Sequence, residues 1–446
     1  MYDIAVIGAG PAGYTAAIKA SQAGLNVVLF EKDLIGGTCL NKGCIPTKTI
    51  LYSCNLLSEL KNADKYGISA DNISFDFIKI QERQKEISAK LRKALTGVIK
   101  NHKITIIEEE ANVIDSNTII TKNDTYKAKN IIIATGSTPN TIKFPGTYDS
   151  NFILTSDDVL NLSVLPESII IAGSGAIGTE WARIFSSLGT KVTVVEIMKN
   201  IIPSADYEVS QRIARIFKRN KIDVYTETSI QEINGNNVKL SNGKELTVDC
   251  ILIAAGRQPE VNFGEINKAI KTDKFVETSD NYRTKINNIY AIGDVNGKSL
   301  LAHSAIKQAE DLIEFIVNGK SKVFDKNLVP SVIYGSPEIA SIGCTEQFLI
   351  ENKTKYKKSI FPVSALGKAH SEDKIEGFIK ILADEEKILG THIISEEASA
   401  MIEQIAVAMK NNISPEELKD VIYAHPTYSE GIHESLLTLK ETENNI

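Results

Sequence analysis

Short apolar runs that lead into glycine-rich turns set the pattern of the first two thirds of the chain. Residues 3–13, DIAVIGAGPAG, pass from an apolar run into such a turn, and an amphipathic stretch and a second apolar run, VVLF, follow. The same order returns from residue 169, IIIAGSGAIG, to KVTVV. Apolar runs of about four to eight residues are typical of strands buried on both faces. The pattern therefore predicts two copies of a strand–helix–strand unit with parallel strands.

A different pattern begins near residue 330. Residues 330–446 combine β-rich stretches, among them GFIKILAD and KILGTHIIS, with helical stretches such as EEASAMIEQIAVAMKNN, and they lack a glycine turn of the earlier kind. This order predicts an α+β domain with antiparallel strands. Domains of this kind often form symmetric dimers. We expect the chain to combine two α/β units with one C-terminal α+β domain.

The two glycine turns share one spacing, and an acidic residue follows each of them. In both copies the first glycine lies 23 residues before the acid. The residues are Gly8, Gly10, Gly13 and Glu31 in the first copy and Gly173, Gly175, Gly178 and Glu196 in the second. In dinucleotide-binding folds the glycines allow a tight turn, close approach to a pyrophosphate and helix–strand packing, and the acid binds ribose hydroxyls. We therefore predict two dinucleotide sites.

The acid of the second copy favours one nucleotide. Glu196 follows the strand KVTVV, and Lys199 is the only cation in the segment IMKNIIP behind it. A carboxylate hydrogen-bonds the 2′-hydroxyl of NAD and repels the 2′-phosphate of NADP. We expect the second site to bind NAD.

Three later apolar runs also end in turns. IIIATGSTPN contains Gly136 and ILIAAGRQPE contains Gly256, and each is expected to return the chain to a sheet beside its nucleotide. Asp294 follows the run INNIYAI. Its carboxylate is placed to reach a second ribitol or phosphate group, and the alternative is an ordinary Asx turn.

Length and composition narrow the class of protein. A chain of 446 residues is expected to form two to four domains, and 43% apolar with 24% charged residues is typical of a globular protein. A formal charge of −6 argues against nucleic acid as the main partner. No apolar run approaches the ~20 residues that cross a bilayer. MYDIAVIGAG leads directly into a strand pattern, so we expect a cytoplasmic protein without a signal peptide or membrane contact.

Two cysteines lie close together in GGTCLNKGCIPTK, residues 36–48. Five cysteines over this length do not form a disulfide scaffold, and the spacing C-x-x-x-x-C is not that of a zinc site, so no metal is expected. Glycines 36, 37 and 43 indicate close backbone approach, whereas the simpler alternative is two buried structural thiols. With two dinucleotide sites, the pair suggests an electron path between nicotinamide, flavin and disulfide. The other cysteines, Cys54, Cys250 and Cys344, lie in apolar patterns typical of core thiols.

The segment GGTCLNKGCIPTK resembles the redox-active disulfide segment of the flavin-dependent pyridine nucleotide disulfide oxidoreductases. Within that family, Leu40-Asn41 and Ile45-Pro46 most resemble the dihydrolipoamide dehydrogenases. The resemblance covers essentially the whole chain. Its other motifs are residues 8–13, 173–196, 255–257, 292–294, 337–340 and 425–427.

The resemblance implies an α/β fold with two Rossmann-like domains, which bind FAD and NAD, and a C-terminal α+β dimerisation domain. The domain limits expected from it are 1–142 and 263–328 for the two parts of the FAD-binding domain, 143–262 for the NAD-binding domain and 329–446 for the dimerisation domain. The residues expected to bind the two cofactors are Gly8, Gly10, Gly13, Glu31, Gly37, Thr38, Lys48, Ala111, Gly136, Gly173, Gly175, Gly178, Glu180, Glu196, Gly256, Asp294 and Ala302.

The resemblance also implies catalytic roles. Cys39 is expected to form the mixed disulfide with substrate, and Cys44 to lie against the flavin as a thiolate. Lys48 is expected near the flavin ring, with Glu180 as its ion-pair partner. In AHPTYSEG, His425 with Glu430 resembles the acid–base pair of the family, which acts on the disulfide of the other subunit. A homodimer would then be required for activity.

The activity implied is the oxidation of protein-bound dihydrolipoamide to lipoamide with NAD⁺. The lipoyl group would come from a lipoyl domain or carrier protein of a 2-oxoacid dehydrogenase or a glycine cleavage system, and the sequence distinguishes neither these two nor the direction of electron flow. Glu196 and the segment LNKGCIPTK disfavour glutathione reductase. Mercuric and large thioredoxin reductases use a further C-terminal thiol site, whereas the last cysteine here is Cys344. Another low-molecular-weight disulfide as substrate, or a docking subunit of a multienzyme complex, remain alternatives.

Two positions depart from the family pattern. Lys42 stands where a small apolar residue is usual, and it is expected either to tune the charge around Cys44 or to face solvent. Glu260 stands where asparagine is usual, which leaves its local contacts open.

Overall fold

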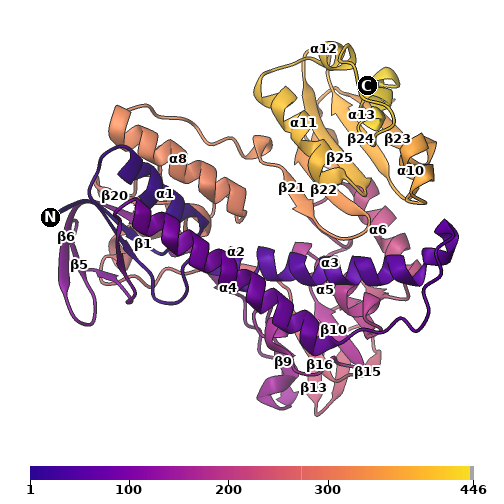
Figure 1. Ribbon diagram of the computed structural model, residues 1–446, viewed down its shortest axis with the longest axis horizontal. Coiled ribbons are helices and arrows are strands. Elements are labelled where there is room, and N and C mark those ends of the chain that lie inside the picture. The colour runs from indigo at the N-terminus through magenta and orange to yellow at the C-terminus, as the bar shows by residue number, and fades with distance from the viewer. Residues whose placement is uncertain (273, 442–446) are drawn as a thin grey trace.

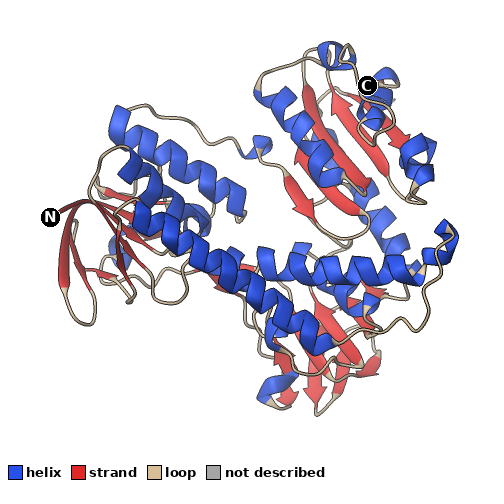
Figure 2. Ribbon diagram, in the orientation of Figure 1, coloured by secondary structure: helices blue, strands red, loops and turns tan. Residues whose placement is uncertain are grey.

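The computed structural model describes residues 1–272 and 274–441. Three bodies are visible in Figure 1: an N-terminal sheet with its helices, a second sheet below the long helices, and a C-terminal sheet at the upper right. Figure 2 shows that each of the three bodies contains both strands and helices. The predicted fold class, two α/β units and a C-terminal α+β domain, is confirmed. The residue limits of the domains stay predictions.

The N-terminal sheet has the strand order β3-β2-β1-β6-β5-β4, and β20 also pairs with β6. Its parallel strands are β1 (Tyr2–Ile7), β2 (Val27–Phe30), β3 (Thr105–Ile107), β6 (Thr125–Ile133) and β20 (Ile289–Ala291), and β4 (Asn112–Val113) and β5 (Thr118–Ile120) continue it with antiparallel pairing. Helices α1 (Pro11–Gln22) and α8 (Ala302–Asn318) pack against its apolar side chains. Strand β20 brings a segment from residue 289 back to the first sheet.

The second sheet repeats this arrangement with the order β12-β11-β10-β16-β9. Its strands, all parallel, are β9 (Ile153–Leu154), β10 (Ser168–Ala172), β11 (Lys191–Val195), β12 (Asp223–Tyr225) and β16 (Cys250–Ile253). Helix α5 (Ala176–Ser187) follows the glycine turn, and α6 (Tyr207–Arg219) follows β11. A small sheet of β8 (Gly146–Thr147), β13 (Ile230–Asn234), β14 (Asn237–Leu240) and β15 (Glu245–Thr247) lies beside it. The two glycine turns therefore occupy equivalent places in two parallel sheets.

Two long helices connect the N-terminal body to the second one. Helices α2 (Gly37–Lys42), α3 (Cys44–Lys61) and α4 (Phe77–Asn101) follow β2, and Figure 1 shows α3 and α4 running across to the second sheet. Side chains of α3 share a buried core with Trp181 and Phe185 of α5. The amides of Gln81 and Gln84 donate to the carbonyls of Val159 and Leu160 at 3.0 Å each. The cysteine segment thus lies where the two nucleotide-binding bodies meet.

The C-terminal sheet is antiparallel, with the order β21-β22-β25-β24-β23-β26. Its strands are β21 (Ser331–Ile333), β22 (Glu338–Gly343), β23 (Lys357–Pro362), β24 (Phe378–Ala383), β25 (Ile388–Ser395) and β26 (Lys440–Glu441), and the main helices are α11 (Ala398–Lys410) and α13 (Glu430–Leu437). Shorter elements are α7 (Asn267–Ile270), α9 (Glu346–Glu351), α10 (Gly367–Ser371), α12 (Pro415–Lys419), β7 (Ser137–Pro139), β17 (Arg257–Pro259), β18 (Lys271–Thr272) and β19 (Phe275–Val276).

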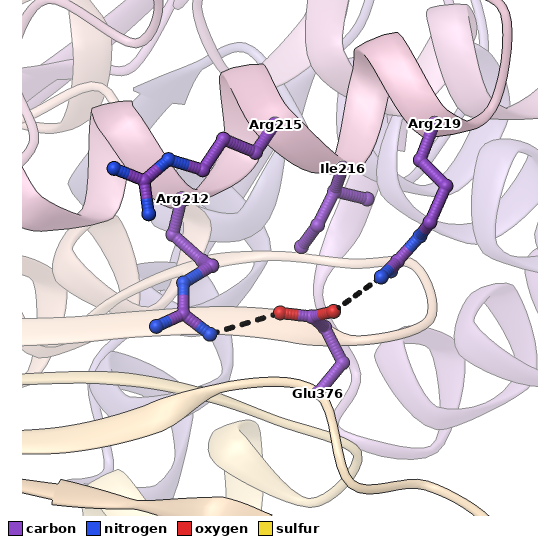
Figure 3. Close-up of a pocket in the computed structure, with 5 residues that line it drawn as sticks. All are labelled: Arg212, Arg215, Ile216, Arg219 and Glu376. Carbon is purple, nitrogen blue, oxygen red and sulfur yellow. Dashed lines mark hydrogen bonds and ion pairs between the residues drawn. The ribbon is translucent and has the colours of Figure 1, made fainter.

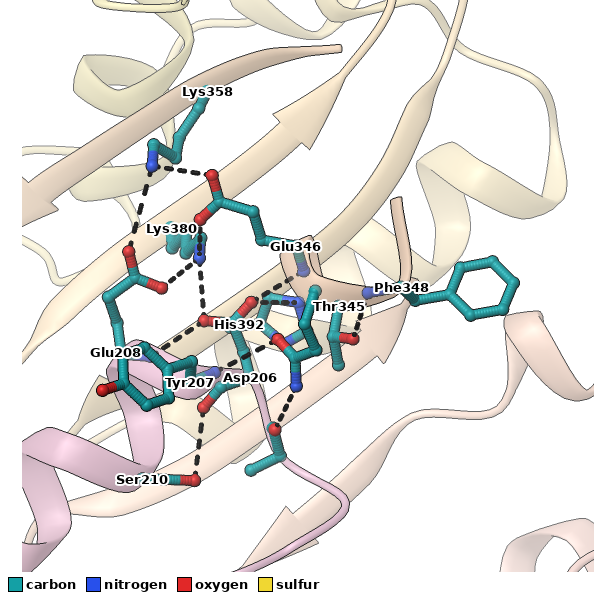
Figure 4. A network of polar contacts seen from close by, with 12 residues as sticks. Asp206, Tyr207, Glu208, Ser210, Thr345, Glu346, Phe348, Lys358, Lys380 and His392 are labelled. Atoms are coloured by element: carbon teal, nitrogen blue, oxygen red, sulfur yellow. Dashed lines mark hydrogen bonds and ion pairs between the residues drawn. The ribbon is translucent and has the colours of Figure 1, made fainter. Parts of the chain in front are cut away.

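Ion pairs join helix α6 to the C-terminal sheet. Arg212 and Arg219 of α6 hold the two carboxylate oxygens of Glu376 at 3.0 and 2.7 Å (Figure 3). Deeper in the same contact, the buried amine of Lys380 lies among the carboxylates of Asp206, Glu208 and Glu346 (Figure 4). The contact between the second body and the C-terminal sheet therefore combines these ion pairs with a shared apolar core that includes Ile339, Phe378 and Ile394.

Two of the three cysteines predicted to be core thiols are buried, namely Cys54 and Cys250. Cys344 is only partly buried, because it follows the last residue of β22 at the end of the strand. Within the described residues, no helix has both the length and the apolar character that a membrane crossing requires. No cluster of three or more potential metal ligands was found in the same residues.

Candidate active site

The two cysteines of the close pair lie on successive short turns of helix. Cys39 is inside α2, Cys44 is the first residue of α3, and Gly43 separates the two helices. Asn41 anchors this segment, because its side-chain amide donates to the carbonyls of Ile35 and Gly37 at 3.1 and 2.9 Å. Both cysteines are free, partly buried thiols in the structure. The N-terminus of α3 offers its positive dipole end to the sulfur of Cys44.

The two thiols differ in acidity. The hydrogen bond between them raises the pKa of Cys39, and burial raises it further. The same hydrogen bond, followed by the charge of Lys48, lowers the pKa of Cys44 to about 7, although burial opposes this shift. Cys44 is therefore the sulfur that carries a thiolate near neutral pH, and Cys39 is the one that holds its proton.

Lys48 lies one turn beyond Cys44 on α3, and its amine donates to both carboxylate oxygens of Glu180 at 2.8 Å. Glu180 belongs to α5 of the second body and also accepts the backbone N–H of Tyr334 at 3.0 Å. The amine of Lys48 lies 4.7 Å from the ring centroid of Tyr334, which adds a cation–π contact. Three bodies of the fold therefore meet at this lysine.

The first glycine turn has the shape of a pyrophosphate cradle. A Cβ at Gly13 would lie 1.8 Å from the carbonyl oxygen of Gly8, so helix and turn touch directly. A Cβ at Gly10 would meet only Gly37, at 3.9 Å, so this side of the turn is open. Glu31 accepts the N–H of Ala9 at 2.8 Å, which holds the acid beside the turn. These residues fit the dinucleotide part of FAD.

The second turn repeats this geometry. A Cβ at Gly178 would lie 2.0 Å from the carbonyl oxygen of Gly173, whereas one at Gly175 would meet nothing within 4 Å. Glu196 accepts the N–H of Ser174 at 2.9 Å and its hydroxyl at 2.7 Å. The remaining lone pairs of this carboxylate fit the two ribose hydroxyls of NAD.

Asp294 is tied to the first body by a long-range hydrogen bond. It is the second residue of a short 3₁₀ helix, and its carboxylate accepts the hydroxyl of Ser137 at 2.5 Å. Arg257 donates to the same hydroxyl at 2.8 Å and to the carbonyl of Ser137 at 2.6 Å. Burial raises the pKa of Asp294. The side chain of Asp294 therefore belongs to a polar network with Ser137 and Arg257. The alternative weighed from the sequence, an ordinary Asx turn, does not account for this long-range hydrogen bond.

The other residues expected at the cofactors lie around the first cradle. Gly37 packs against Gly10, and the hydroxyl of Thr38 lies 3.5 Å from the guanidinium of Arg257. Ala302 is the first residue of α8. Ala111 lies just before β4, and Gly136 and Gly256 adjoin the paired strands β7 and β17. Their contacts to a cofactor stay predictions.

The two departures from the family pattern also have partners. The amine of Lys42 pairs with Asp33 at 2.6 Å, and Glu260 lies 3.5 Å from Lys32. Lys42 therefore faces the end of β2, next to the first cradle, and its charge is largely offset by Asp33. Neither pair was expected from the sequence, because each depends on how the loops fold back.

His425 and Glu430 form the expected pair at the edge of the C-terminal body. Nδ1 of His425 lies 2.8 Å from Oε1 of Glu430, and the N–H of Thr427 donates to Oε2 at 2.8 Å. The carboxylate favours a proton on Nδ1 and leaves Nε2 as a base. The side chain of His425 is 77% exposed and belongs to a different body from the redox helices (Figure 1). A single chain thus presents this base outward.

Sequence reasoning missed three residues of this region, namely Arg257, Tyr334 and Arg183. Arg257 was visible as part of the turn GRQP, yet its partner Ser137 lies 120 residues earlier. Tyr334 acts through its backbone and ring, which leave no signature in sequence. The sequence pattern places Arg183 on the polar face of an amphipathic helix, but in the structure the residue is buried.

Comparisons with known proteins agree with this geometry. Residues 2–309 match the family described as "Pyridine nucleotide-disulphide oxidoreductase", and residues 329–436 match its dimerisation domain. The chain is 37% identical over 440 residues to dihydrolipoyl dehydrogenase of Chlamydia pneumoniae, covering 96% of this chain and 95% of that one. It is 35% identical over 442 residues to that of Mycoplasma pneumoniae, with 97% of each chain covered.

Solved structures give the same result. The flavoprotein disulfide reductase RclA of Escherichia coli superposes with a TM-score of 0.89 at 26% identity, covering 98% of this chain and 100% of that one. LpdA of Mycobacterium tuberculosis has a TM-score of 0.90 at 24% identity, with 98% and 99% covered, and shows the fold alone. The family expected from the redox segment is confirmed. The chain belongs to the pyridine nucleotide-disulphide oxidoreductase family.

Proposed function

We propose that this chain is an NAD-dependent dihydrolipoyl dehydrogenase, which oxidises dihydrolipoamide to lipoamide through Cys39 and Cys44. FAD and NAD are the cofactors of the family and of the relatives named above. The observation that carries the proposal is the junction around Lys48, whose amine lies one turn beyond Cys44 and contacts Glu180 of the second body at 2.8 Å. The hydrogen bond from Cys39, together with this cation, lowers the pKa of Cys44. The proposed reaction begins from the oxidised pair, with a disulfide between Cys39 and Cys44.

The reaction at sulfur follows from the two acidities. A base, His425 of the partner subunit, takes the proton of one substrate thiol, and the thiolate attacks Sγ of Cys39. The bond between Cys39 and Cys44 breaks, and Cys44 leaves as the thiolate that its low pKa favours. The second substrate thiol displaces Cys39, which takes up a proton, and cyclic lipoamide is released. The substrate has lost two electrons and the cysteine pair has gained them.

The chain's own residues hold the cofactors during this exchange. The chemistry supplied by bound FAD is the transfer of an electron pair between a dithiol and a nicotinamide. The two open glycine turns and the acids Glu31 and Glu196 would bind the two nucleotides. Lys48 would stabilise negative charge at the flavin, held in place by Glu180.

We propose that the active unit is a homodimer, supported by the match to the dimerisation domain and by the outward position of His425. The lipoyl group would come from a lipoyl domain or carrier protein of a 2-oxoacid dehydrogenase or a glycine cleavage system. A cytoplasmic location is part of the same proposal, and cysteines that lack any structural disulfide support it.

Two assays on the purified protein test the activity. NADH formation from dihydrolipoamide is expected to be fast, and reduction of glutathione disulfide with NADPH negligible; the reverse result would overturn the substrate assignment. His425→Gln is expected to slow dihydrolipoamide oxidation by about 10²-fold or more. The same variant should leave NADH reduction of a flavin-directed dye nearly unchanged, and equal losses in both assays would argue against His425 as the thiol base.

A further inference from the structure

Arg183 is a buried cation directly beside the Lys48 site. It lies on α5, one turn after Glu180, and only 7% of its surface is exposed. Nη1 donates to the carbonyl of Pro337 at 2.5 Å. In the described part of the chain, Nε and Nη2 have no hydrogen-bond partner. Burying a guanidinium with unpaired N–H groups is unfavourable, so its position calls for a compensating role.

The loop of residues 334–337 is held to α5 at both of its ends. The N–H of Tyr334 donates to Glu180, and the carbonyl of Pro337 accepts from Arg183. Between these ends, a Cβ on Gly335 would lie 1.9 Å from Nη1 of Arg183, so the loop closes directly over the guanidinium. This loop sets the ring of Tyr334 over the amine of Lys48.

Charge around Arg183 is balanced by three carboxylates. Glu180 has the largest influence on it, followed by Glu396 and Glu338. Glu396 is hydrogen-bonded by Ser336 of the same loop at 2.8 Å. Burial nevertheless lowers the pKa of Arg183 to about 10, so the guanidinium is charged at neutral pH. Two cations therefore act on Glu180: Lys48, which it contacts at 2.8 Å, and Arg183, three residues further along the same helix.

This position has a consequence for Cys44. The carboxylate of Glu180 raises the pKa of Cys44, against the effect of Lys48. Arg183, on the same helix as Glu180, is a second cation that offsets part of this negative charge. The groups that face Cys44 are Cys39, Lys48, Glu180, Tyr14, Arg257 and Tyr334. Arg183 interacts with one member of this set, Glu180.

We propose that Arg183 is a positioning residue for the redox centre: it holds loop 334–337 against α5 and offsets Glu180, so that Lys48 supports a thiolate at Cys44. The inference rests on the proposed function, because it takes the cysteine pair as the redox centre. Through Glu180, the contact between the second body and the C-terminal body would then influence the acidity of Cys44.

The test is the pH dependence of the Cys44 thiol in the holoenzyme. In a Cys39→Ser background, the rate of modification by methyl methanethiosulfonate is measured from pH 5 to 9. Mass spectrometry assigns the site, because Cys54, Cys250 and Cys344 are also present. With Arg183→Gln the midpoint should move to higher pH by about half to one pKa unit, and from a pKa of about 7 this lowers the rate at pH 7 about two- to fivefold.

Further variants separate charge from packing. Arg183→Lys keeps the cation and should titrate close to the Cys39→Ser parent. Gly335→Ala should behave like Arg183→Gln, because its Cβ displaces the guanidinium from the loop side, and it tests the inference even if Arg183→Gln fails to fold. Arg215→Gln on α6 is the control, since it removes an exposed arginine from the same body.

Two results would overturn the inference: a midpoint in Arg183→Gln and Gly335→Ala equal to that of Arg215→Gln, or an equal shift in Arg183→Lys and Arg183→Gln. Failure of the proposed function is seen separately. A wild-type protein that does not oxidise dihydrolipoamide, but whose Cys44 titration depends on Arg183, overturns the proposed function alone.

Discussion

Replacing Lys380 by methionine tests whether charge holds the second body to the C-terminal sheet. Lys380 lies on β24 with a fully buried side chain. Its amine donates to Asp206 at 2.8 Å and to Glu346 at 2.6 Å, and it also contacts Glu208 (Figure 4). Methionine has a similar length and volume, so Lys380→Met removes the charge and leaves most of the packing.

The magnitude follows from the carboxylates left behind. Removing one partner of a buried ion pair destabilises a protein by about 3–5 kcal/mol, because the other charge stays buried without compensation. Lys358 remains 2.7 Å from Glu346 and offsets part of that loss, whereas Asp206 is fully buried and has no such second lysine in reach among the described residues. In a domain of roughly 150–250 residues, a loss of 1 kcal/mol lowers the melting temperature by about 2–4 °C. We therefore expect the melting temperature of Lys380→Met to be about 10 °C lower than that of the wild type at pH 7.5.

The pH dependence gives a second check with a definite sign. Burial alone would raise the pKa of Asp206, but His392, Glu208 and Lys380 outweigh it, and the pKa lies below its usual value. A carboxyl group with a lowered pKa stabilises the fold above its unfolded pKa, ~3.9 for Asp, and this contribution is lost as the pH falls below it. The pKa of Glu208, by contrast, already lies above its usual value through burial and its hydrogen bond with Asp206, and loss of the Lys380 cation raises it further. The fall in melting temperature caused by Lys380→Met should therefore be largest at pH 7.5 and become smaller toward pH 4.5, as the carboxyl groups take up protons.

Thermal unfolding followed by circular dichroism at pH 7.5 and pH 4.5 measures both effects. Lys357→Met is the matched control, because Lys357 lies on β23 of the same sheet and pairs with the exposed Glu385 at 2.7 Å. Surface pairs of this kind contribute little. The buried charge would not hold this contact if Lys380→Met and Lys357→Met had the same melting temperature at pH 7.5. The same conclusion would follow if Lys380→Met lowered the melting temperature equally at both pH values.

Three further predictions concern the cofactors and the base. Gly10→Ala should keep its fold and lose flavin, because its Cβ enters only the open side of the turn, whereas Gly13→Ala should lose folded protein, since its Cβ collides with Gly8; flavin absorbance and circular dichroism distinguish them. Glu196→Ser should reduce the preference for NADH over NADPH by about tenfold or more, measured as a ratio of kcat/KM. Glu430→Gln should slow dihydrolipoamide oxidation by about tenfold or more, with dye reduction by NADH as the unaffected reference.

The parts of this fold that sequence reasoning predicted well depend on local chemistry. Gly13 and Gly178 are needed because a Cβ at either position would lie only 1.8 or 2.0 Å from a backbone carbonyl oxygen, so no other residue fits there. Buried parallel strands read as continuous apolar runs, so both Rossmann units were visible before any contact was known. His425 and Glu430 are only five residues apart, but their pairing as acid and base was expected from the family resemblance.

Contacts between residues far apart in the chain could not be predicted from local patterns. The partner of Lys48 lies 132 residues away and was expected only from family resemblance, and Ser137 as the partner of Asp294 was not expected at all. Lys380 and Arg183 are single charges in otherwise ordinary strand and helix patterns.

The amino-acid sequence by itself therefore determined the two nucleotide-binding units and the cysteine pair, because steric fit and hydrophobic periodicity act between neighbours on the chain. Only the tertiary structure decided which charges are buried and what they face. Burial and ion pairing depend on which surfaces of distant elements come together, and an isolated lysine or arginine has the same chemistry in sequence whether water or three carboxylates surround it.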